Sequence, residues 1–217
     1  MALELGTRQL EGVGAVEVYS VSQDDPLAAP LIAELALEYS SRYGGTREAM
    51  LDDLTTYPAE EFAYPQGALL VLTHDGLPIA GGAFRQFDST TAELKRIWTS
   101  VDYRKRGLGK AVVRELEREI ELRGYNRVFL TTGPRQPEAV ALYLSSGYTP
   151  LYDASLSPEE VGVHPFEKQL RVLENVTRAA IPTDGLTTPG FDLVHLRTTI
   201  QSDRETWLID VAATPPE

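Results

Sequence analysis

The residues best suited to chemistry form one short basic segment, residues 104–110. Glycine lets a backbone N–H approach a ligand closely, and the first turn of a helix adds unpaired N–H donors at the positive end of its dipole. Apolar residues at helical spacing follow the two glycines, so a helix is expected to begin there. These features predict a pyrophosphate-binding loop. The segment reads Arg104, Lys105, Arg106, Gly107, Leu108, Gly109 and Lys110.

The charge around this loop also indicates an anion site. Residues 93–110 carry a net charge of +4, whereas the whole chain carries −12, so the remainder carries −16. A basic island in an acidic protein favours local anion binding over a nucleic-acid face, which needs a broad basic surface. The alternative is a solvated basic turn, and the spacing of the glycines before a helix weighs against it.

Two other phosphate-binding patterns match the loop poorly. A nucleotide P-loop has four residues between its glycines and a Ser or Thr after the lysine, but Ala111 follows Lys110 here. A dinucleotide-binding loop has a third glycine, and Val112 stands at that position. A dinucleotide-binding loop also follows parallel strands, whereas hairpin signals precede the loop of this chain.

The elements that must position the loop alternate in type. Apolar alternation and turn signals predict strands at residues 16–21, 67–73, 77–87, 92–99, 126–132, 148–152 and 163–170. Helical spacing predicts helices from Asp24-Asp25-Pro26 to Gly44, then at residues 47–54, 108–123 and 137–145. Gly81-Gly82 suggests a bulge or close packing in its strand. An antiparallel meander followed by a strand–loop–helix–strand–helix unit is a mixed α/β domain.

Composition limits which other classes of protein this chain can belong to. The 217 residues are 42% hydrophobic, enough for one core with room for an appendage. No apolar run approaches the roughly 20 residues of a membrane span, and no signal peptide is apparent, so we expect no membrane association. The absence of cysteine excludes disulfides and a Cys nucleophile and fits a cytoplasmic protein. His74, His164 and His195 lack ligand spacing, so no metal is expected.

Three separated motifs resemble the GNAT superfamily of N-acetyltransferases. The loop matches that superfamily's Arg/Gln-x-x-Gly-x-Gly/Ala pattern at Arg104, Gly107 and Gly109. Residues 139–148 resemble its Ala-x-x-Leu-Tyr-x-x-x-Gly-Phe/Tyr segment, and residues 166–170 resemble its final strand. The resemblance covers residues 15–170 and implies a GNAT-like fold, with a central mixed, mostly antiparallel sheet flanked by helices.

The resemblance implies acetyl-CoA as cosubstrate, without a metal. Backbone groups of Ile97 and Thr99 would hold the pantetheine and the acyl carbonyl, and the loop would hold the pyrophosphate. Trp98 lies between them but is out of phase with Glu93, which favours core packing for its side chain. The predicted cofactor-binding residues are Ile97, Trp98, Thr99, Arg104, Lys105, Arg106, Gly107, Leu108, Gly109 and Lys110.

The resemblance also implies two catalytic residues for direct transfer to a primary amine in a ternary complex. Tyr143 matches the tyrosine that protonates the departing CoA sulfur, although it could instead be a packing residue. Glu93 matches a general base, although it could form an ion pair with Lys95 while water takes the proton. The alternative function is a non-catalytic acyl-CoA-binding or sensor protein on the same fold.

The acceptor is less well specified. Residues 1–92 carry a net charge of −10, and Asp52, Asp53, Glu60 and Glu61 flank Tyr57 and Tyr64. This acidic, aromatic region could attract a cationic amine, or it could be an ordinary solvated face. A small amine, an amino acid, a peptide terminus and a protein lysine all remain open.

Residues 171–217 lie outside the resemblance and are expected to form a C-terminal extension. Alternating apolar residues predict a β-hairpin from strands at residues 191–200 and 206–212. A lone hairpin is marginal in water, so it should pack on the domain or exchange with a second subunit. The exchange would give a homodimer.

Overall fold

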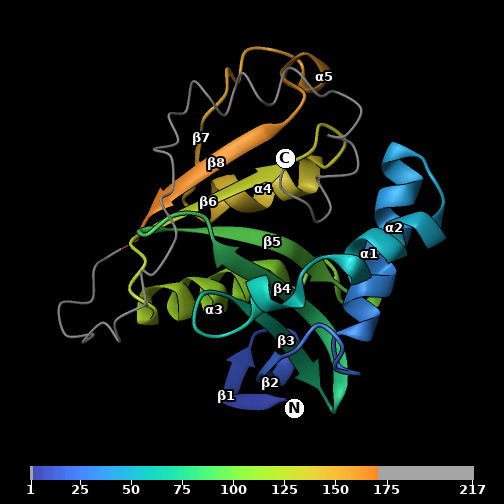
Figure 1. Ribbon diagram of the computed structural model, residues 1–217, viewed down its shortest axis with the longest axis vertical. Coiled ribbons are helices and arrows are strands. Elements are labelled where there is room, and N and C mark those ends of the chain that lie inside the picture. The colour runs from blue at the N-terminus through green and yellow to red at the C-terminus, as the bar shows by residue number, and fades with distance from the viewer. Residues whose placement is uncertain (1, 171–217) are drawn as a thin grey trace.

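The computed structural model describes residues 2–170, so the predicted C-terminal hairpin lies outside the described residues. They form a mixed α/β fold around an eight-stranded sheet of order β1-β2-β3-β4-β5-β6-β8-β7 (Figure 1). Strands β5 and β6 pair in parallel and the other neighbours are antiparallel, so the sheet is mixed and mostly antiparallel, as predicted. The strands are β1 Leu3–Leu10, β2 Gly14–Val21, β3 Ala68–His74, β4 Leu77–Gln86, β5 Thr91–Thr99, β6 Arg127–Thr132, β7 Thr149–Pro150 and β8 His164–Gln169.

Helices cover both faces of the sheet. Strand β3 shows this best, because Leu70 and Leu72 belong to a core cluster with α3 and α4, whereas Leu69 and Val71 belong to a second cluster with α1 and α2. Successive side chains of a strand point to opposite faces, so β3 is buried on both. The helices are α1 Ala29–Tyr43, α2 Arg47–Thr56, α3 Leu108–Leu122, α4 Pro137–Ser145 and α5 Pro158–Val161, with 3-10 turns η1 Ala59–Phe62 and η2 Val101–Tyr103.

Most predicted elements are present, and the differences have local causes. Strand β1 was not predicted, because a register shift between Glu4 and Gly6 breaks its apolar alternation. Helix α1 begins later than predicted, since the Asp25 carboxylate accepts from the Leu27 N–H at 3.1 Å and closes a separate turn first. The strand expected at residues 148–152 is reduced to β7, and an unpredicted α5 follows it.

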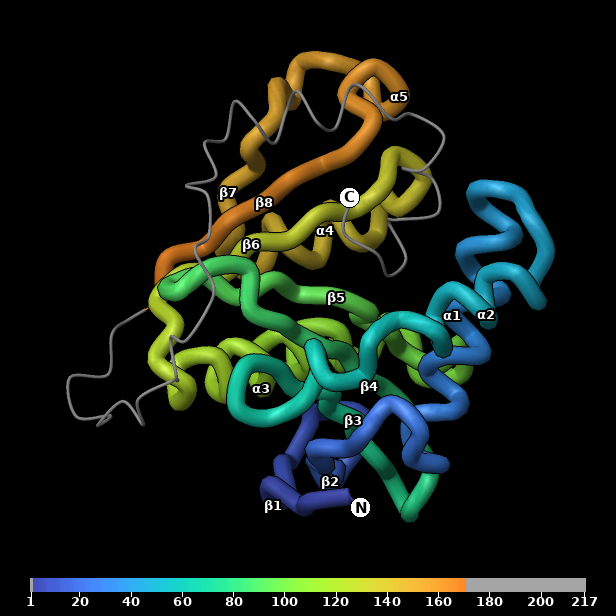
Figure 2. The backbone as a smooth tube through the Cα atoms, viewed as in Figure 1, coloured from blue at the N-terminus to red at the C-terminus, as the bar shows by residue number. Residues whose placement is uncertain are grey.

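The two central strands diverge, and this divergence shapes the site. Strand β6 pairs only with the first part of β5, ending at Leu94 opposite Leu130. In Figure 2 the two strands begin together and separate toward α1. A bulge in β5 accompanies the change, because Ala83 faces Lys95 whereas Gly81 faces Trp98.

The bulge depends on the two residues that oppose each other there. Arg96 has a φ of 58°, a left-handed conformation that is uncommon outside glycine. On the facing strand, a Cβ on Gly82 would lie 2.7 Å from Cδ1 of Ile97 and 3.0 Å from side-chain atoms of α3, so β4 packs closely against both there. The sequence prediction of a bulge or close packing at Gly81-Gly82 is therefore confirmed.

Candidate active site

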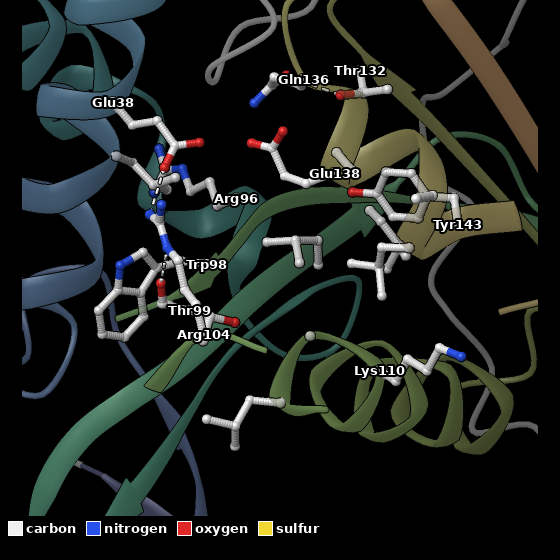
Figure 3. Close-up of a pocket in the computed structure, with 18 of the residues that line it drawn as sticks. Glu38, Arg96, Trp98, Thr99, Arg104, Lys110, Thr132, Gln136, Glu138 and Tyr143 are labelled. Carbon is white, nitrogen blue, oxygen red and sulfur yellow. Dashed lines mark hydrogen bonds and ion pairs between the residues drawn. The ribbon is translucent and has the colours of Figure 1, made fainter. Parts of the chain in front are cut away.

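A pocket of about 660 Å³ opens where β5 and β6 diverge (Figure 3). Its wall is built from the end of α1, the second half of β5, the loop before α3, the end of β6, and α4. The elements come from distant parts of the chain, so the pocket exists only once the sheet has formed. Its volume is in the range of small-molecule and cofactor sites.

One end of the pocket is the N-terminus of α3. Gly107 is its N-cap, with a left-handed φ of 79°, and the first helical hydrogen bond runs from the Ala111 N–H to the Gly107 carbonyl at 3.1 Å. The N–H groups of Leu108, Gly109 and Lys110 therefore precede the first helical acceptor. A Cβ on Gly107 would meet no atom within 4 Å, so open space borders this end of the helix. Donors, dipole and space together fit a phosphate group.

The cations of the loop are placed unequally. Arg104, Lys105 and Lys110 line the pocket together with the two glycines and Leu108. The guanidinium of Arg106 instead lies 5.1 Å from the centre of the Tyr103 ring and donates to the Asp102 carbonyl at 3.2 Å. Of the loop residues predicted to bind the cofactor, Arg106 is thus the one outside the pocket wall.

An ion-pair chain crosses from this end to α1 and α4. Arg104 donates to Glu38 at 2.8 Å, and Glu38 also lies 3.1 Å from Arg42. Arg42 in turn pairs with Glu138 at the start of α4. Figure 3 shows Glu38 and Arg104 on one side of the pocket and Glu138 on the other. Sequence reasoning missed Glu38, Arg42 and Glu138, since nothing local marks them as partners of the loop.

Tyr143 projects from α4 into the opposite side of the pocket. Figure 3 shows its hydroxyl pointing into the cavity, while its ring packs 5.7 Å from the ring of Tyr148 and 5.8 Å from that of Phe166. The residue is 6% exposed, and burial raises its pKa above the ordinary value of 10.0. The hydroxyl therefore stays protonated near neutral pH and can donate a proton.

A polar wall next to Tyr143 was not predicted from the sequence. The amide oxygen of Gln136, the N-cap of α4, accepts from the Thr132 hydroxyl at 2.9 Å and from the Gly133 N–H at 3.1 Å. These bonds tie the end of β6 to the start of α4 and hold the helix that carries Tyr143. The only sequence signals for this junction were the predicted strand at residues 126–132 and the predicted helix start at Pro137.

The predicted β5 segment lines the pocket in full. Ile97, Trp98 and Thr99 all contribute to its wall. The indole N–H of Trp98 donates to Glu34 of α1 at 2.9 Å, and the ring is 3% exposed in the core cluster of α1 and α2. Its side chain therefore packs, as expected, while its backbone borders the cavity.

Glu93 does not line the pocket. Its carboxylate is held between the Arg85 Nε at 2.8 Å and the Lys95 Nζ at 3.0 Å. Burial alone would raise the pKa of Glu93, but the Lys95 and Arg85 cations lower it below its ordinary value. The ion pair considered in the sequence analysis is present, and the base role of Glu93 stays a prediction that this placement weighs against.

The acidic, aromatic region predicted near α2 is not part of the pocket wall. Glu61 accepts from Arg85 at 2.7 Å, and Tyr57 is buried beside it. Cations dominate the wall instead, with six Lys or Arg side chains and two Glu, namely Arg42, Lys95, Arg96, Arg104, Lys105 and Lys110 with Glu38 and Glu138. The wall therefore does not supply the acidic attraction for a cationic amine that was considered.

Residues 2–170 contain neither a candidate metal site nor a membrane-spanning helix. Within that range, His, Asp and Glu side chains form no group of three or more that could hold a metal ion. The helices found there are too short or too polar to cross a bilayer.

Comparison with known proteins identifies the family. The profile of the acetyltransferase (GNAT) family matches residues 32–148. YsnE of Bacillus subtilis (strain 168), an uncharacterized N-acetyltransferase, is 33% identical over 93 residues, which cover 40% of this chain and 62% of YsnE. The matched region thus spans less than two thirds of the length of that relative.

Solved structures show the same fold at low sequence identity. The GNAT domain of S. lividans PAT has a TM-score of 0.57 at 17% identity, covering 78% of this chain and 97% of that one. A GNAT acetyltransferase from Staphylococcus aureus MU50 has a TM-score of 0.56 at 13% identity, and the match covers 72% of this chain and 99% of that one. The PaiA N-acetyltransferase of Thermoplasma acidophilum, in complex with coenzyme A, has a TM-score of 0.52 at 17% identity, and the match covers 71% of this chain and 98% of that one. Since the family profile spans more than half of the chain and reaches from α1 to the end of α4, the chain belongs to the GNAT family of acetyltransferases.

Proposed function

We propose that this protein is an N-acetyltransferase that moves an acetyl group directly from acetyl-CoA to a primary amine in a ternary complex. The observation that supports this best is a single pocket that joins the donor-rich start of α3 to the Tyr143 hydroxyl. The catalytic domain would comprise residues 15–170, with β1 added to its sheet. The acceptor would be a small molecule or a peptide.

The cofactor would lie along the wall from α3 to β5. The N–H groups that start α3, with Arg104, Lys105 and Lys110, suit the pyrophosphate. Among residues 2–170, no strand pairs with the β6-facing edge of β5 beyond Leu94, so within that range the backbone groups near Ile97 and Thr99 make no ladder bonds on that side. That edge suits the amide groups of a pantetheine arm and the acyl carbonyl.

Bound acetyl-CoA supplies a thioester carbonyl, and the residues around it manage the protons. As the amine nitrogen bonds to the carbonyl carbon and the C–S bond breaks, Tyr143 would donate its proton to the departing sulfur. Its hydroxyl is protonated at neutral pH and points into the pocket, which places a proton within the cavity. Because Glu93 lies outside the pocket wall and is engaged by Arg85 and Lys95, we propose that water at the pocket mouth takes the proton from the amine.

Two measurements test the proposal in sequence. Calorimetry should show binding of acetyl-CoA in the micromolar range, and a panel of primary amines should include some that release free thiol and yield the acetylated amine by mass spectrometry. Binding without thiol release across the panel would favour the non-catalytic acyl-CoA-binding protein. Absence of binding would contradict the assignment of the pocket.

A further inference from the structure

Arg96 is a buried cation in the pocket wall, and no anionic side chain of residues 2–170 lies beside it. It is 3% exposed and stands at the β5 bulge, next to Ile97 and on the same side of the pocket as Glu38 (Figure 3). Its guanidinium donates to the Gln23 side-chain carbonyl at 2.6 Å and to the Leu54 backbone carbonyl at 2.8 Å. Both acceptors are neutral, so they hold the side chain without balancing its charge.

Aromatic rings and a buried donor complete this environment. The guanidinium carbon lies 4.4 Å from the centre of the Phe62 ring and 5.6 Å from that of Tyr57. The Nε atom is buried and has no hydrogen-bond partner. Burial lowers the pKa of Arg96 to about 10, as expected for a cation removed from water without a compensating charge.

Carboxylates on β5 itself and on α1 are already engaged by other groups. Glu93 is paired with Arg85 and Lys95, and Glu34 accepts from the Trp98 indole. Among residues 2–170, no carboxylate lies within ion-pair distance of the Arg96 guanidinium. A buried charge without a partner costs free energy, and an anion that enters the pocket would recover it.

We propose that Arg96 binds an anionic group of the acceptor, so that the substrate is an amine that also carries a carboxylate or a phosphate. This inference rests on the proposed function, since it concerns the acceptor of that reaction. The planar guanidinium fork suits both oxyanions. Arg96 directly precedes Ile97, near which the acyl carbonyl would lie, so the anion would fix the acceptor close to the reacting group.

A purely structural role for Arg96 makes a different prediction. If the side chain only ties α2 to the sheet through Leu54, removing it should lower stability and affect all acceptors alike. If it binds the acceptor, its removal should change the preference between acceptors. The ratio of two acceptors on one protein sample separates these roles, because stability cancels from the ratio.

Matched pairs of acceptors test the inference on the unmodified protein. Amino acids are compared with the amines left after loss of the carboxylate, for example phenylalanine with phenethylamine. Phosphoethanolamine is compared with ethanolamine, which distinguishes phosphate from carboxylate. We expect kcat/KM to be about 10- to 100-fold higher for the anionic member of at least one pair, the usual range for a charge-assisted hydrogen bond. Equal or better use of every neutral member would overturn the inference.

Variants then assign the preference to Arg96. Arg96→Met keeps length but removes the charge, and it should bring the ratio of anionic to neutral acceptor close to one. Arg123→Met is the control, because Arg123 is also largely buried over an aromatic ring, Phe84, but lies outside the pocket wall. It should keep the wild-type ratio. If Arg96→Met keeps that ratio as well, the inference is wrong.

The failure of this inference is distinguishable from failure of the proposed function. Acetyl-CoA affinity is measured by calorimetry for each variant, and thermal unfolding confirms that each is folded. Acetylation of neutral amines without any preference for anionic ones leaves the proposed function intact and rejects the role of Arg96. If no amine of either kind is acetylated, the proposed function fails and the inference falls with it.

Discussion

The phosphate end of the pocket and its β5 wall are built in opposite ways. The phosphate end consists of consecutive residues, 104–110, and its Arg104 side chain is 44% exposed. The β5 side joins two residues of the pocket wall, Lys95 and Arg96, to Arg85 and Glu93, which lie outside the wall, and all four are largely buried. One region presents local backbone geometry and solvated cations, whereas the other consists of charges that tertiary packing has removed from water.

This contrast has an energetic consequence. Charges in water are screened, so exposed pairs contribute little and can exchange partners readily. Buried charges interact strongly, and breaking a buried pair leaves its partner uncompensated. We therefore expect variants of the buried charges on β4 and β5 to affect stability, and variants of the phosphate end to affect ligand affinity with little effect on stability.

The largest expected effect concerns the buried carboxylate. Glu93→Gln leaves Arg85 and Lys95 without their shared anion, and it should lower the free energy of unfolding by about 3 kcal/mol or more. Chemical denaturation measures this loss. Glu167→Gln is the matched control, because Glu167 pairs with Arg127 at 2.7 Å but is 30% exposed, and it should cost at most about 1 kcal/mol. Similar losses of unfolding free energy in both variants would contradict the difference expected between buried and exposed ion pairs.

The same carboxylate predicts the acid limit of stability. The pKa of Glu93 is lower in the folded state than the ordinary 4.5, so the unfolded chain binds more protons in acid. Its stabilisation is present above about pH 4.5 and is lost as the pH falls through the folded-state pKa. Glu93→Gln should flatten this dependence. A folded Gln variant whose turnover falls most at low pH would instead support the base role.

The next effect concerns catalysis at the far side of the pocket. Tyr143→Phe keeps the ring but removes the acid, and it should lower kcat about 10²-fold with little change in acetyl-CoA affinity. Tyr148→Phe is the control, since its hydroxyl donates to Glu117 at 2.9 Å outside the pocket wall. It should cost about 1 kcal/mol of stability and leave turnover within about twofold. Wild-type turnover in Tyr143→Phe would make Tyr143 a packing residue.

A smaller effect separates two neighbouring cations of the phosphate end. Arg104→Ala should weaken acetyl-CoA binding about tenfold, because Arg104 lines the pocket and phosphate pairs with arginine strongly. Arg106→Ala should change the affinity less than about twofold, because that side chain lies over Tyr103. Calorimetry at two salt concentrations compares them. An equal loss of acetyl-CoA affinity in both variants would show that Arg106 also binds the cofactor. Neither variant should lower the unfolding temperature appreciably.

The smallest effect concerns the ion pair that occupies Arg104. Glu38→Gln removes a competing anion, so acetyl-CoA should bind about twofold to fivefold more tightly, the range for an exposed ion pair. Glu119→Gln changes the net charge equally but acts on Arg123, away from the pocket, and should leave the affinity unchanged. Weaker binding in Glu38→Gln would show that Glu38 holds Arg104 in its binding position rather than competing for it.

The sequence by itself predicted what depends on neighbours along the chain. Helix α4 has the predicted bounds, and the hairpin turn at Asp75 and Gly76 and the start of α3 at Leu108 follow from local residue types. The motif around Gly107 predicted a phosphate cradle because its donors and cations are consecutive. The mixed, mostly antiparallel sheet followed from the order of the elements.

Only the tertiary structure decided which charges meet. The sequence placed Glu93 and Lys95 on one face of β5, but the engagement of that carboxylate by Arg85 depends on the β4–β5 register. The bulge at Arg96 interrupts the alternation of side chains between the two faces of β5. Counting residues along the strand therefore could not place Arg96 in the pocket wall. The pairing of Arg104 with Glu38 joins residues 66 positions apart. Contacts across such distances are set by packing of the whole sheet, which no local pattern encodes.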